Sequence, residues 1–333
     1  MFKTNFYKTF YLLAIIIFLK STNLFGKSTD SPDLDNFPKN KISWNEWILK
    51  TKNDLKHKNY KDDTLNYLDT IKFNPRVIEL DRKQPEFRLT FDKYFNNVVN
   101  TKSKKKINEQ YNKNKALLKK IELEFSVSAK ILSALWGIET SFGKHTGKMD
   151  IIRSLASLAY DGRRKEFFTK ELENALNILE SDHFERSSFK GSWAGAFGQT
   201  QFMPSTFLKH AIDFDGDSKV NLFKKSDALA SGANYLKKIG WNNNLQWGEE
   251  ININLTDELK KLAKNKVYKD IIFWSGYGIK LNKEYGKSKL KLVIPDSNNN
   301  ECYLVSKNYD VILNWNRSNY FALTVFLFSD EIK

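Results

Sequence analysis

The stretch Ile131-Leu-Ser-Ala-Leu-Trp-Gly-Ile-Glu-Thr-Ser-Phe-Gly143 is predicted to form a helix that ends at Gly143. Within it Leu132, Trp136 and Glu139 recur at helical spacing, so they share one face. Glu139 is therefore a carboxyl group on an apolar stripe, in the last turn, where the helix dipole is negative. Loss of water and the dipole both disfavour the charged form, so we expect a raised pKa, as a general acid requires. The alternative is an ordinary helix-end Glu that faces solvent.

Amphipathic helices are expected around this stretch, because apolar residues recur at helical spacing over 44–55, 113–125, 151–160, 168–179 and 226–239. The character changes after residue 243. The segments 251–255 and 290–294 alternate with period 2, and 302–305 is predicted to return as a strand. Helix is expected again over 309–327, with a break at 314–318. The pattern indicates a mainly α-helical α+β protein with a small β-rich insert.

A glycine-rich stretch, GSWAGAFGQTQFMPS, occupies residues 191–205. Its glycine spacing matches neither a dinucleotide-binding turn nor a phosphate-binding loop, so both are excluded. Glycines instead allow the backbone to approach another helix or a ligand closely. The flat side chains of Phe197 and Phe202 and the amide of Gln201 suit a sugar. The alternative for Gln201 is that its amide binds the backbone of its own loop.

Residues 213–221 resemble the first nine positions of an EF-hand calcium loop. Two departures weaken the resemblance: Ser218 replaces the usual glycine at position 6, and Lys224 replaces the glutamate at position 12. We expect Asp227 to supply the missing carboxylate, and the alternative is an acidic turn without metal. The candidate ligands are Asp213, Asp215, Asp217, the Lys219 carbonyl, Asn221 and Asp227.

The composition indicates a globular protein of 333 residues, with 41% hydrophobic and 28% charged residues and a net charge of +15. The basic run at 101–106 contains no aromatic residues, so we expect a solvated helix face and not a nucleic-acid site. Removing residues 1–26, with their three lysines and no acid, would leave +12. A basic exported protein favours a polyanionic partner such as cell wall, although scattered lysines explain the charge equally well.

Residues 1–26 are predicted to be a signal peptide or an uncleaved N-terminal anchor. Lys3 and Lys8 precede an apolar run over 10–19, which is short for a membrane span. The protein is therefore expected to be exported, in the periplasm and in part membrane-associated. Cys302 is the single cysteine, so no internal disulfide can form.

Several long motifs occur in one order: WGIETSFG, RSLASLAYDGRR, GSWAGAFGQTQFMPSTF, the aspartate loop with DALASGANYL, and ILNWNRSNYFA. Together they resemble the membrane-bound lytic murein transglycosylase B family, over roughly residues 80–330. The resemblance implies a lysozyme-like core with a flanking helical domain. The expected parts of the chain are a linker at 27–43, which is rich in Ser, Asp, Pro and Asn, a helical region at 44–120, the catalytic core at 121–242, the β-rich insert at 243–305 and a C-terminal helix at 306–333 that returns to the core.

The resemblance also implies site residues. Glu139 falls on the family's catalytic glutamate, and Arg163 and Arg164 fall beside the part of the cleft that meets the stem peptide. The arginines have a second interpretation as a surface ion pair. The aspartate loop falls on an EF-hand-like calcium site, and Lys224 departs from an acidic residue there. The positions that would contact glycan are Ser192, Gln201, Phe202, Asn316 and Tyr320.

The implied reaction is cleavage of the bond between N-acetylmuramic acid and N-acetylglucosamine in peptidoglycan, without water, to give a 1,6-anhydro sugar. No cofactor is required for it, a structural calcium aside, and a monomer is expected. One Glu without a partner carboxylate in the next helix suits such a reaction, whereas ordinary glycosidases use two. Two alternatives stay open: a hydrolytic muramidase, with Asp161 or Glu166 as the second carboxylate, and a non-catalytic wall-binding protein.

Overall fold

The computed structural model describes residues 42–82, 89–296 and 301–333. The expected signal segment 1–26 lies outside these residues, and so does all of the predicted linker except its last two residues. The described chain divides into two compact units. Unit 1 comprises 42–82 and 139–232, and unit 2 comprises 89–138, 233–296 and 301–333. Two helices, α7 and α11, have residues in both units.

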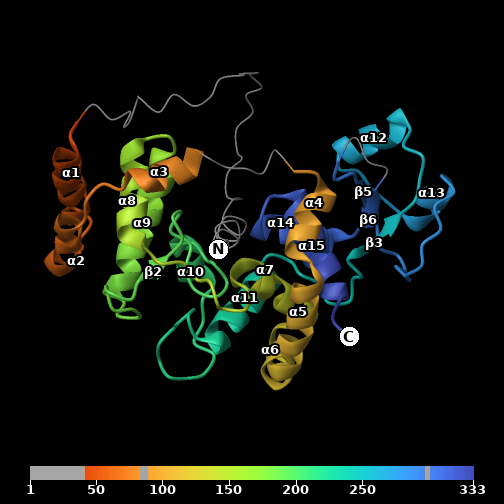
Figure 1. Ribbon diagram of the computed structural model, residues 1–333, viewed down its shortest axis with the longest axis horizontal. Helices are drawn as coiled ribbons and strands as arrows, with labels where there is room; N and C mark the ends of the chain where they lie inside the picture. Colours follow the sequence, from red (N-terminus) through yellow and green to blue (C-terminus); the bar gives the residue numbers. More distant parts are fainter. Residues whose placement is uncertain (1–41, 83–88, 297–300) are drawn as a thin grey trace, which may run out of the picture. The chain divides into compact units, whose positions relative to one another are not determined.

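Unit 1 is mainly helical (Figure 1). Its elements are α1 (Trp44–Lys56), α2 (Asp62–Asn66), the 3-10 helix η1 (Tyr67–Thr70), α3 (Pro75–Arg82), the end of α7 (Ala129–Thr140), β1 (Met149–Asp150), α8 (Ile151–Asp161), α9 (Lys165–Glu180), β2 (Lys190–Gly191), α10 (Pro204–His210) and the first part of α11 (Lys225–Lys238). The short strands β1 and β2 pair antiparallel, with Met149 opposite Gly191.

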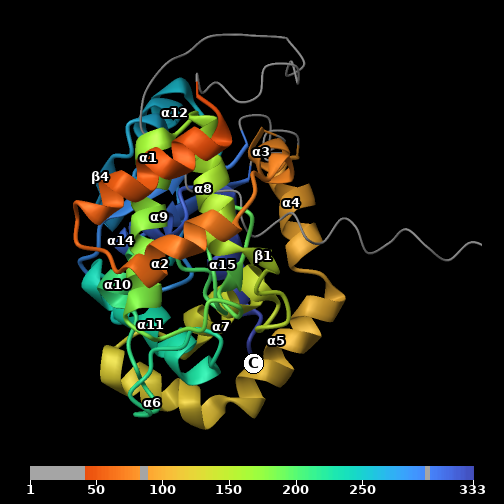
Figure 2. The ribbon, with the colours of Figure 1, turned by 90° about the vertical axis from the view of Figure 1, so that its left-hand side faces the viewer.

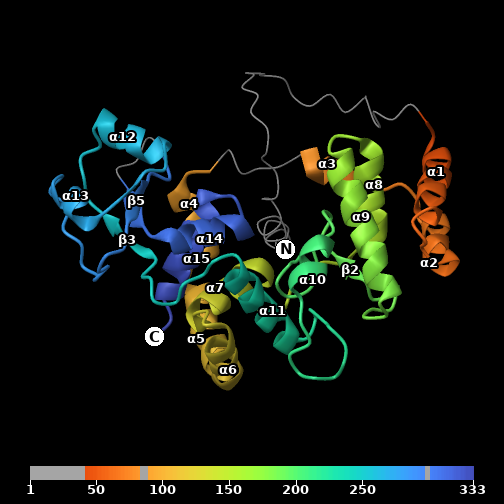
Figure 3. The same cartoon turned by 180° about the vertical axis from the view of Figure 1, so that it is seen from behind.

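The helices α8 and α9 form the centre of unit 1 and lie side by side (Figures 1 and 3). Local sequence fixes the ends of α8: the Asp150 carboxylate accepts from the Arg153 amide at 2.9 Å, and Gly162 ends the helix at φ 86°. Helices α1 and α2 lie across this pair (Figure 2). Trp44 of α1 meets Tyr160 of α8 edge to face, with ring centroids 5.2 Å apart.

Unit 2 contains helices and a four-stranded sheet. Its elements are α4 (Phe91–Val98), α5 (Thr101–Lys113), α6 (Lys115–Phe125), most of α7, the end of α11, β3 (Gly248–Ile251), α12 (Asp257–Lys264), β4 (Tyr268–Lys269), α13 (Ile271–Ser275), β5 (Leu290–Val293), β6 (Cys302–Val305), α14 (Lys307–Trp315) and α15 (Asn319–Asp330). The four strands are antiparallel in the order β3-β6-β5-β4, with Gly248 opposite Val305 and Leu292 opposite Leu304.

The two central strands of the sheet in the predicted β-rich insert, β5 and β6, are buried on both faces, because every one of their residues is buried. On one face Leu290 and Leu304 pack around Trp274, and the Trp274 indole donates to the Leu290 carbonyl at 3.1 Å. On the other face lies Lys291, which is 3% exposed and pairs with Asp310 of α14. Burial lowers the pKa of Lys291 even though Asp310 favours the charged form.

Most of the expected elements are confirmed, including the break between α14 and α15 and the strands β5 and β6. The expected strand over 251–255 is wrong in its position, because β3 runs from Gly248 to Ile251. In the part of the chain that the structure describes, the pairing of β3 with β6 ends at Ile251, which is opposite Cys302. Among the described helices, none has both the length and the apolar character needed to cross a membrane.

Candidate active site

Glu139 stands in the last turn of α7, next to a backbone turn with unusual geometry. Its side chain is 6% exposed, so the interpretation as a solvent-facing Glu is wrong. The three residues after the helix, Ser141 to Gly143, all have positive φ (52°, 64° and 80°). Such a run is costly for residues other than glycine and persists only where the surroundings fix it. The backbone next to the carboxyl group is therefore held by its contacts.

Those contacts come from Thr140 and the glycine-rich stretch. The Thr140 hydroxyl donates to the Gln199 carbonyl at 2.9 Å and accepts from the Gly143 amide at 3.0 Å. An added Cβ on Gly143 would lie 2.5 Å from the Gln199 side-chain oxygen, so this side chain would have to move, and the φ of 80° also favours glycine. Gln199 in turn donates through its side chain to the Phe223 carbonyl at 2.6 Å. Sequence reasoning singled out Gln201 and missed Gln199, which links three segments of unit 1.

The glycine-rich stretch is packed against neighbouring backbone. An added Cβ on Gly147 would lie 2.1 Å from the Gly191 carbonyl oxygen, and one on Gly191 would lie 2.3 Å from the Ala196 carbonyl oxygen. Both positions require glycine because backbone meets backbone there. The stretch also folds back on itself, as Phe197 and Phe202 exchange two backbone hydrogen bonds at 2.9 and 3.1 Å. At these two positions the close neighbour is the backbone of a strand or loop of unit 1, and not another helix.

The predicted glycan-contacting residues of this stretch all make internal contacts. Ser192 is 2% exposed, and its hydroxyl accepts from the Ala196 amide at 3.0 Å. Phe202 is 4% exposed. The Gln201 amide nitrogen donates to the carbonyls of Gly198 and Thr146, at 2.9 and 3.1 Å. Gln201 thus makes the loop-stabilising contacts that were the alternative to a substrate role.

Arg163 and Arg164 both bind Asp81 at the end of α3. Arg163 Nε lies 2.7 Å from the Asp81 carboxylate, and Arg164 pairs with the other carboxylate oxygen. Asp81 is 2% exposed, and the neighbouring pair of Arg82 and Asp161 is 2.9 Å apart. Burial lowers the pKa of Arg164 to about 10 and raises that of Asp161. The ion-pair interpretation of the two arginines is therefore realised, with a buried partner that no sequence motif had indicated.

The two candidate residues near the C-terminus lie in unit 2. Asn316 is 7% exposed and ends α14, and its side-chain oxygen accepts from the Ser318 amide at 3.1 Å. The half-buried Tyr320 hydroxyl donates to Asp296, whose carboxylate also accepts from the Phe91 amide at 2.6 Å. Burial, and then the Asp296 carboxylate, raise the pKa of Tyr320. Asp296 is a second anchoring carboxylate that the sequence did not single out.

The family model described as "Transglycosylase SLT domain" matches residues 43–330. The chain belongs to this family. Membrane-bound lytic murein transglycosylase B of Escherichia coli is 41% identical over 118 residues, which are 35% of this chain and 33% of that protein. The alignment thus spans only a third of this relative. The expected relationship to the murein transglycosylases is confirmed.

Solved structures of the family extend the match over most of the chain. SltB3 from Pseudomonas aeruginosa, in complex with NAG-NAM-pentapeptide, has a TM-score of 0.82 and 33% identity, and covers 86% of this chain and 79% of its own. A second SltB3 structure, in complex with NAG-anhNAM-pentapeptide, matches equally well. E. coli Slt35 in complex with calcium has a TM-score of 0.71 and 25% identity, covering 86% and 91%. The predicted lysozyme-like, mainly helical fold is confirmed.

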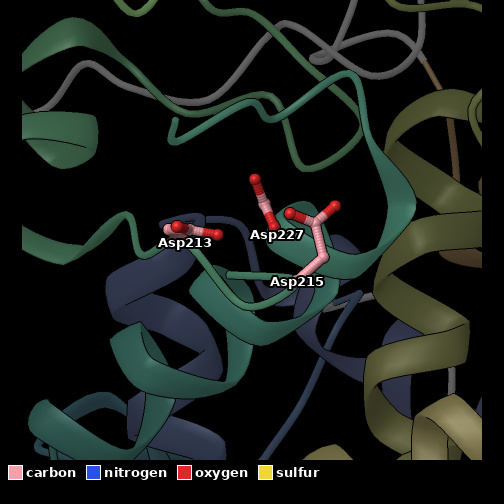
Figure 4. A group of neighbouring side chains, drawn as sticks. All are labelled: Asp213, Asp215 and Asp227. Carbon is pink, nitrogen blue, oxygen red and sulfur yellow. The ribbon is translucent and has the colours of Figure 1, made fainter. Parts of the chain in front are cut away.

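The aspartate loop brings three of the candidate calcium ligands together. Carboxylate oxygens of Asp213, Asp215 and Asp227 lie within 4.8 Å of one another, Asp227 coming from α11 (Figure 4). Lys224 lies in the same loop, and its ammonium group contacts Asp215 at 3.2 Å and pairs with Asp217 as well. A cation ligated by these acids would share them with a charged ammonium group, so the residues present do not fit a calcium site well.

Proposed function

We propose that this protein is a lytic transglycosylase that cleaves the β-1,4 bond between MurNAc and GlcNAc in peptidoglycan. The observation that carries the proposal is the buried carboxyl group of Glu139, at the end of a helix whose next turn is held by Thr140 and Gln199. The family match and the SltB3 complexes, whose ligands are a NAG-NAM peptide and its anhydro form, support the same activity.

In the proposed reaction Glu139 acts twice. As an acid it gives its proton to the glycosidic oxygen, and the bond to the departing GlcNAc breaks. The N-acetyl group of MurNAc stabilises the positive charge that develops at C1. As a base Glu139 then takes the proton of the C6 hydroxyl, whose oxygen bonds to C1 and forms the 1,6-anhydro ring. The internal hydroxyl has a high effective concentration and outcompetes water. None of these steps requires a cofactor.

The two alternatives make different demands on the residues. A hydrolase needs a second carboxylate that activates water. Of the two candidates, Asp161 is 1% exposed and paired with Arg82, while Glu166 is exposed in the first turn of α9. A non-catalytic wall-binding protein would have no use for a buried Glu139. The observed contacts therefore favour neither alternative.

The name of the E. coli relative and the apolar run at 10–19 support an exported protein associated with the membrane. We infer that peptidoglycan is its partner and that it acts as a monomer.

A mass spectrum of digested murein tests the reaction. Anhydro-muropeptides, which are one water lighter than reducing muropeptides, are the expected product. Reducing ends as the main product would favour the hydrolase, and undigested murein under conditions in which the protein is folded would favour the binding protein.

A further inference from the structure

We propose that the Lys224 ammonium group serves the aspartate loop as a built-in cation and takes the place of calcium. Lys224 stands at position 12 of the EF-hand-like pattern, where a bidentate glutamate would otherwise hold the ion. Its Nζ atom contacts Asp215 at 3.2 Å and also pairs with Asp217, so it bridges positions 3 and 5 of the loop. Lys224, at the position of a metal ligand, thus supplies a positive charge itself.

The other carboxylates are satisfied by backbone amides of the same loop. Asp213 accepts from Gly216 at 2.8 Å and from Ser218 at 2.7 Å, one bond to each oxygen. Asp227, which is fully buried, accepts from Phe214 at 3.0 Å and from Asn221 at 2.8 Å. Through these four bonds and the Lys224 bridge, each of the four aspartates Asp213, Asp215, Asp217 and Asp227 has a partner within the protein.

A calcium ion would therefore compete for these carboxylates with the Lys224 ammonium group, which is covalently part of the loop. The ammonium would repel the ion at short range, and the bidentate ligand that EF-hands use is missing. The loop also supports the candidate active site, since the Leu222 carbonyl accepts from the Gln199 amide at 2.8 Å and Phe223 from its side chain. A loop ordered by its own lysine holds Gln199 at any calcium concentration.

Thermal unfolding in chelator and in millimolar calcium chloride tests this. Wild-type protein should melt at the same temperature in both, within about 1 °C. Lys224→Met should melt a few degrees lower in chelator, because it removes the cation that bridges Asp215 and Asp217. Lys224→Glu should also melt lower in chelator but gain several degrees in calcium, because it restores the position-12 ligand. Lys219→Glu makes the same charge change at an exposed position of the loop and should gain no such response.

Three results would overturn the proposal. They are a wild-type protein that gains several degrees in calcium, a Lys224→Met variant as stable as wild type in chelator, and a Lys224→Glu variant that calcium does not stabilise. All three are read from melting curves of the full chain, so they do not depend on whether the protein cleaves peptidoglycan.

A different observation concerns a cavity of about 390 Å³ in unit 2, between α12, β5 and α14. Its lining includes apolar residues such as Leu292 and four lysines, Lys260, Lys264, Lys266 and Lys291. Among the described residues, no acidic one belongs to its lining. The cavity therefore combines an apolar surface with an excess of positive charge, which suits an organic anion.

Acidic residues of the protein neutralise only some of the lysines that line this cavity. Lys291 pairs with Asp310, and Lys260 lies 3.6 Å from the exposed Asp257. Lys264 and Lys266 have no ion-pair partner in the part of the chain that the structure describes. By contrast, Arg163 and Arg164 already share a buried aspartate. The two lysines are thus the cations more available to an external carboxylate.

Resting on the proposed function, we infer that this cavity binds a carboxylate of the peptide attached to the glycan. The test compares two substrates, murein with its peptides and the same glycan after an amidase has removed them. For the double variant Lys264→Glu with Lys266→Glu, we expect kcat/KM to fall about three- to tenfold on the first substrate, the scale of two exposed ion pairs. On the second substrate it should equal wild type.

Lys261→Glu is the matched control, as an exposed lysine of α12 outside the cavity lining. Equal losses on both substrates, or no loss on either, would overturn the inference while leaving the transglycosylase activity intact. Failure of the wild-type protein to cleave either substrate would instead count against the proposed function, and the cavity inference would fall with it.

Discussion

The Thr140 hydroxyl donates a hydrogen bond to the Gln199 carbonyl at 2.9 Å. This bond joins the residue after Glu139 to the glycine-rich stretch, across 59 positions of the chain. Thr140 is 1% exposed, so water cannot replace the bond if it is lost. The contact couples the geometry of the candidate acid to a second segment of unit 1.

Thr140→Val should therefore be costly even though it preserves shape. It leaves the Gln199 carbonyl and the Gly143 amide without this partner, and each buried unpaired group costs about 1–3 kcal/mol. We expect a lower melting temperature and at least a tenfold lower kcat, because Glu139 loses its fixed backbone. Thr140→Ser, which keeps the hydroxyl, should restore most of both. A Val variant with wild-type kcat would show that the bond does not position Glu139.

Glu139→Gln should abolish cleavage of murein and leave the fold intact. Glutamine keeps the shape of the buried side chain but can neither give nor retrieve a proton. Since one residue is proposed to act as both acid and base, the loss should reach on the order of 10³-fold or more. Product release from murein and a melting curve on the same sample provide the check. Turnover within tenfold of wild type would contradict the assignment of Glu139 as the catalytic acid and base.

Gln201→Ala now has a different expected outcome from the one that the sequence favoured. Because its amide holds Gly198 and Thr146, we expect a clear fall in melting temperature, equivalent to about 1–2 kcal/mol. The remaining question is whether Gln201 also contacts glycan. If it does, kcat/KM per folded molecule should fall roughly 10- to 100-fold. A wild-type kcat/KM in the folded fraction would mean that Gln201 stabilises its loop and does not contact glycan.

Asp81→Asn should destabilise unit 1 more than removal of the Arg163 side chain. It leaves Arg164, whose side chain is 16% exposed, without its carboxylate, and breaking such a pair costs about 3 kcal/mol. Arg163 is 45% exposed, so Arg163→Met should cost under about 1 kcal/mol. Urea unfolding of both variants gives the comparison. Equal small losses would mean that this cluster does not hold α3 in place.

Glu249 should make unit 2 sensitive to acid. Burial alone would raise its pKa, but the hydrogen bonds it accepts from Asn282, Lys283 and Tyr285 hold the pKa below the ordinary value of 4.5. Its contribution to stability is therefore complete above pH 4.5 and is lost as the pH falls through the lower folded-state pKa.

A series of melting temperatures from pH 7 to pH 3 can detect this effect. The wild-type protein should lose more stability on acidification than Glu249→Gln, which has no carboxyl group to protonate at this site. Parallel curves for the two proteins would contradict the assignment.

The helices could be predicted from the sequence because the spacing of their apolar residues and their capping residues are local features. The Trp44 helix begins with a capping box between Ser43 and Glu46, and α8 has a capping aspartate and a terminal glycine. The burial of Glu139 followed from its place on the stripe of Leu132 and Trp136, because a helix places residues of that spacing on one face. The ordered motifs were enough to indicate the family.

Tertiary structure decided which partner each polar group takes. No motif in the sequence indicated that Asp81 would be buried between Arg163 and Arg164, because these arginines lie 82 and 83 positions away from it along the chain. In the same way Gln199, rather than Gln201, bridges Thr140 and Phe223. Lys224 looked like a defect in a calcium loop, and its long side chain folds back onto Asp215. The sequence by itself determined helices, family and candidate acid through short-range periodicity and motif order, whereas hydrogen-bond and ion partners depend on distances that only packing of remote segments sets.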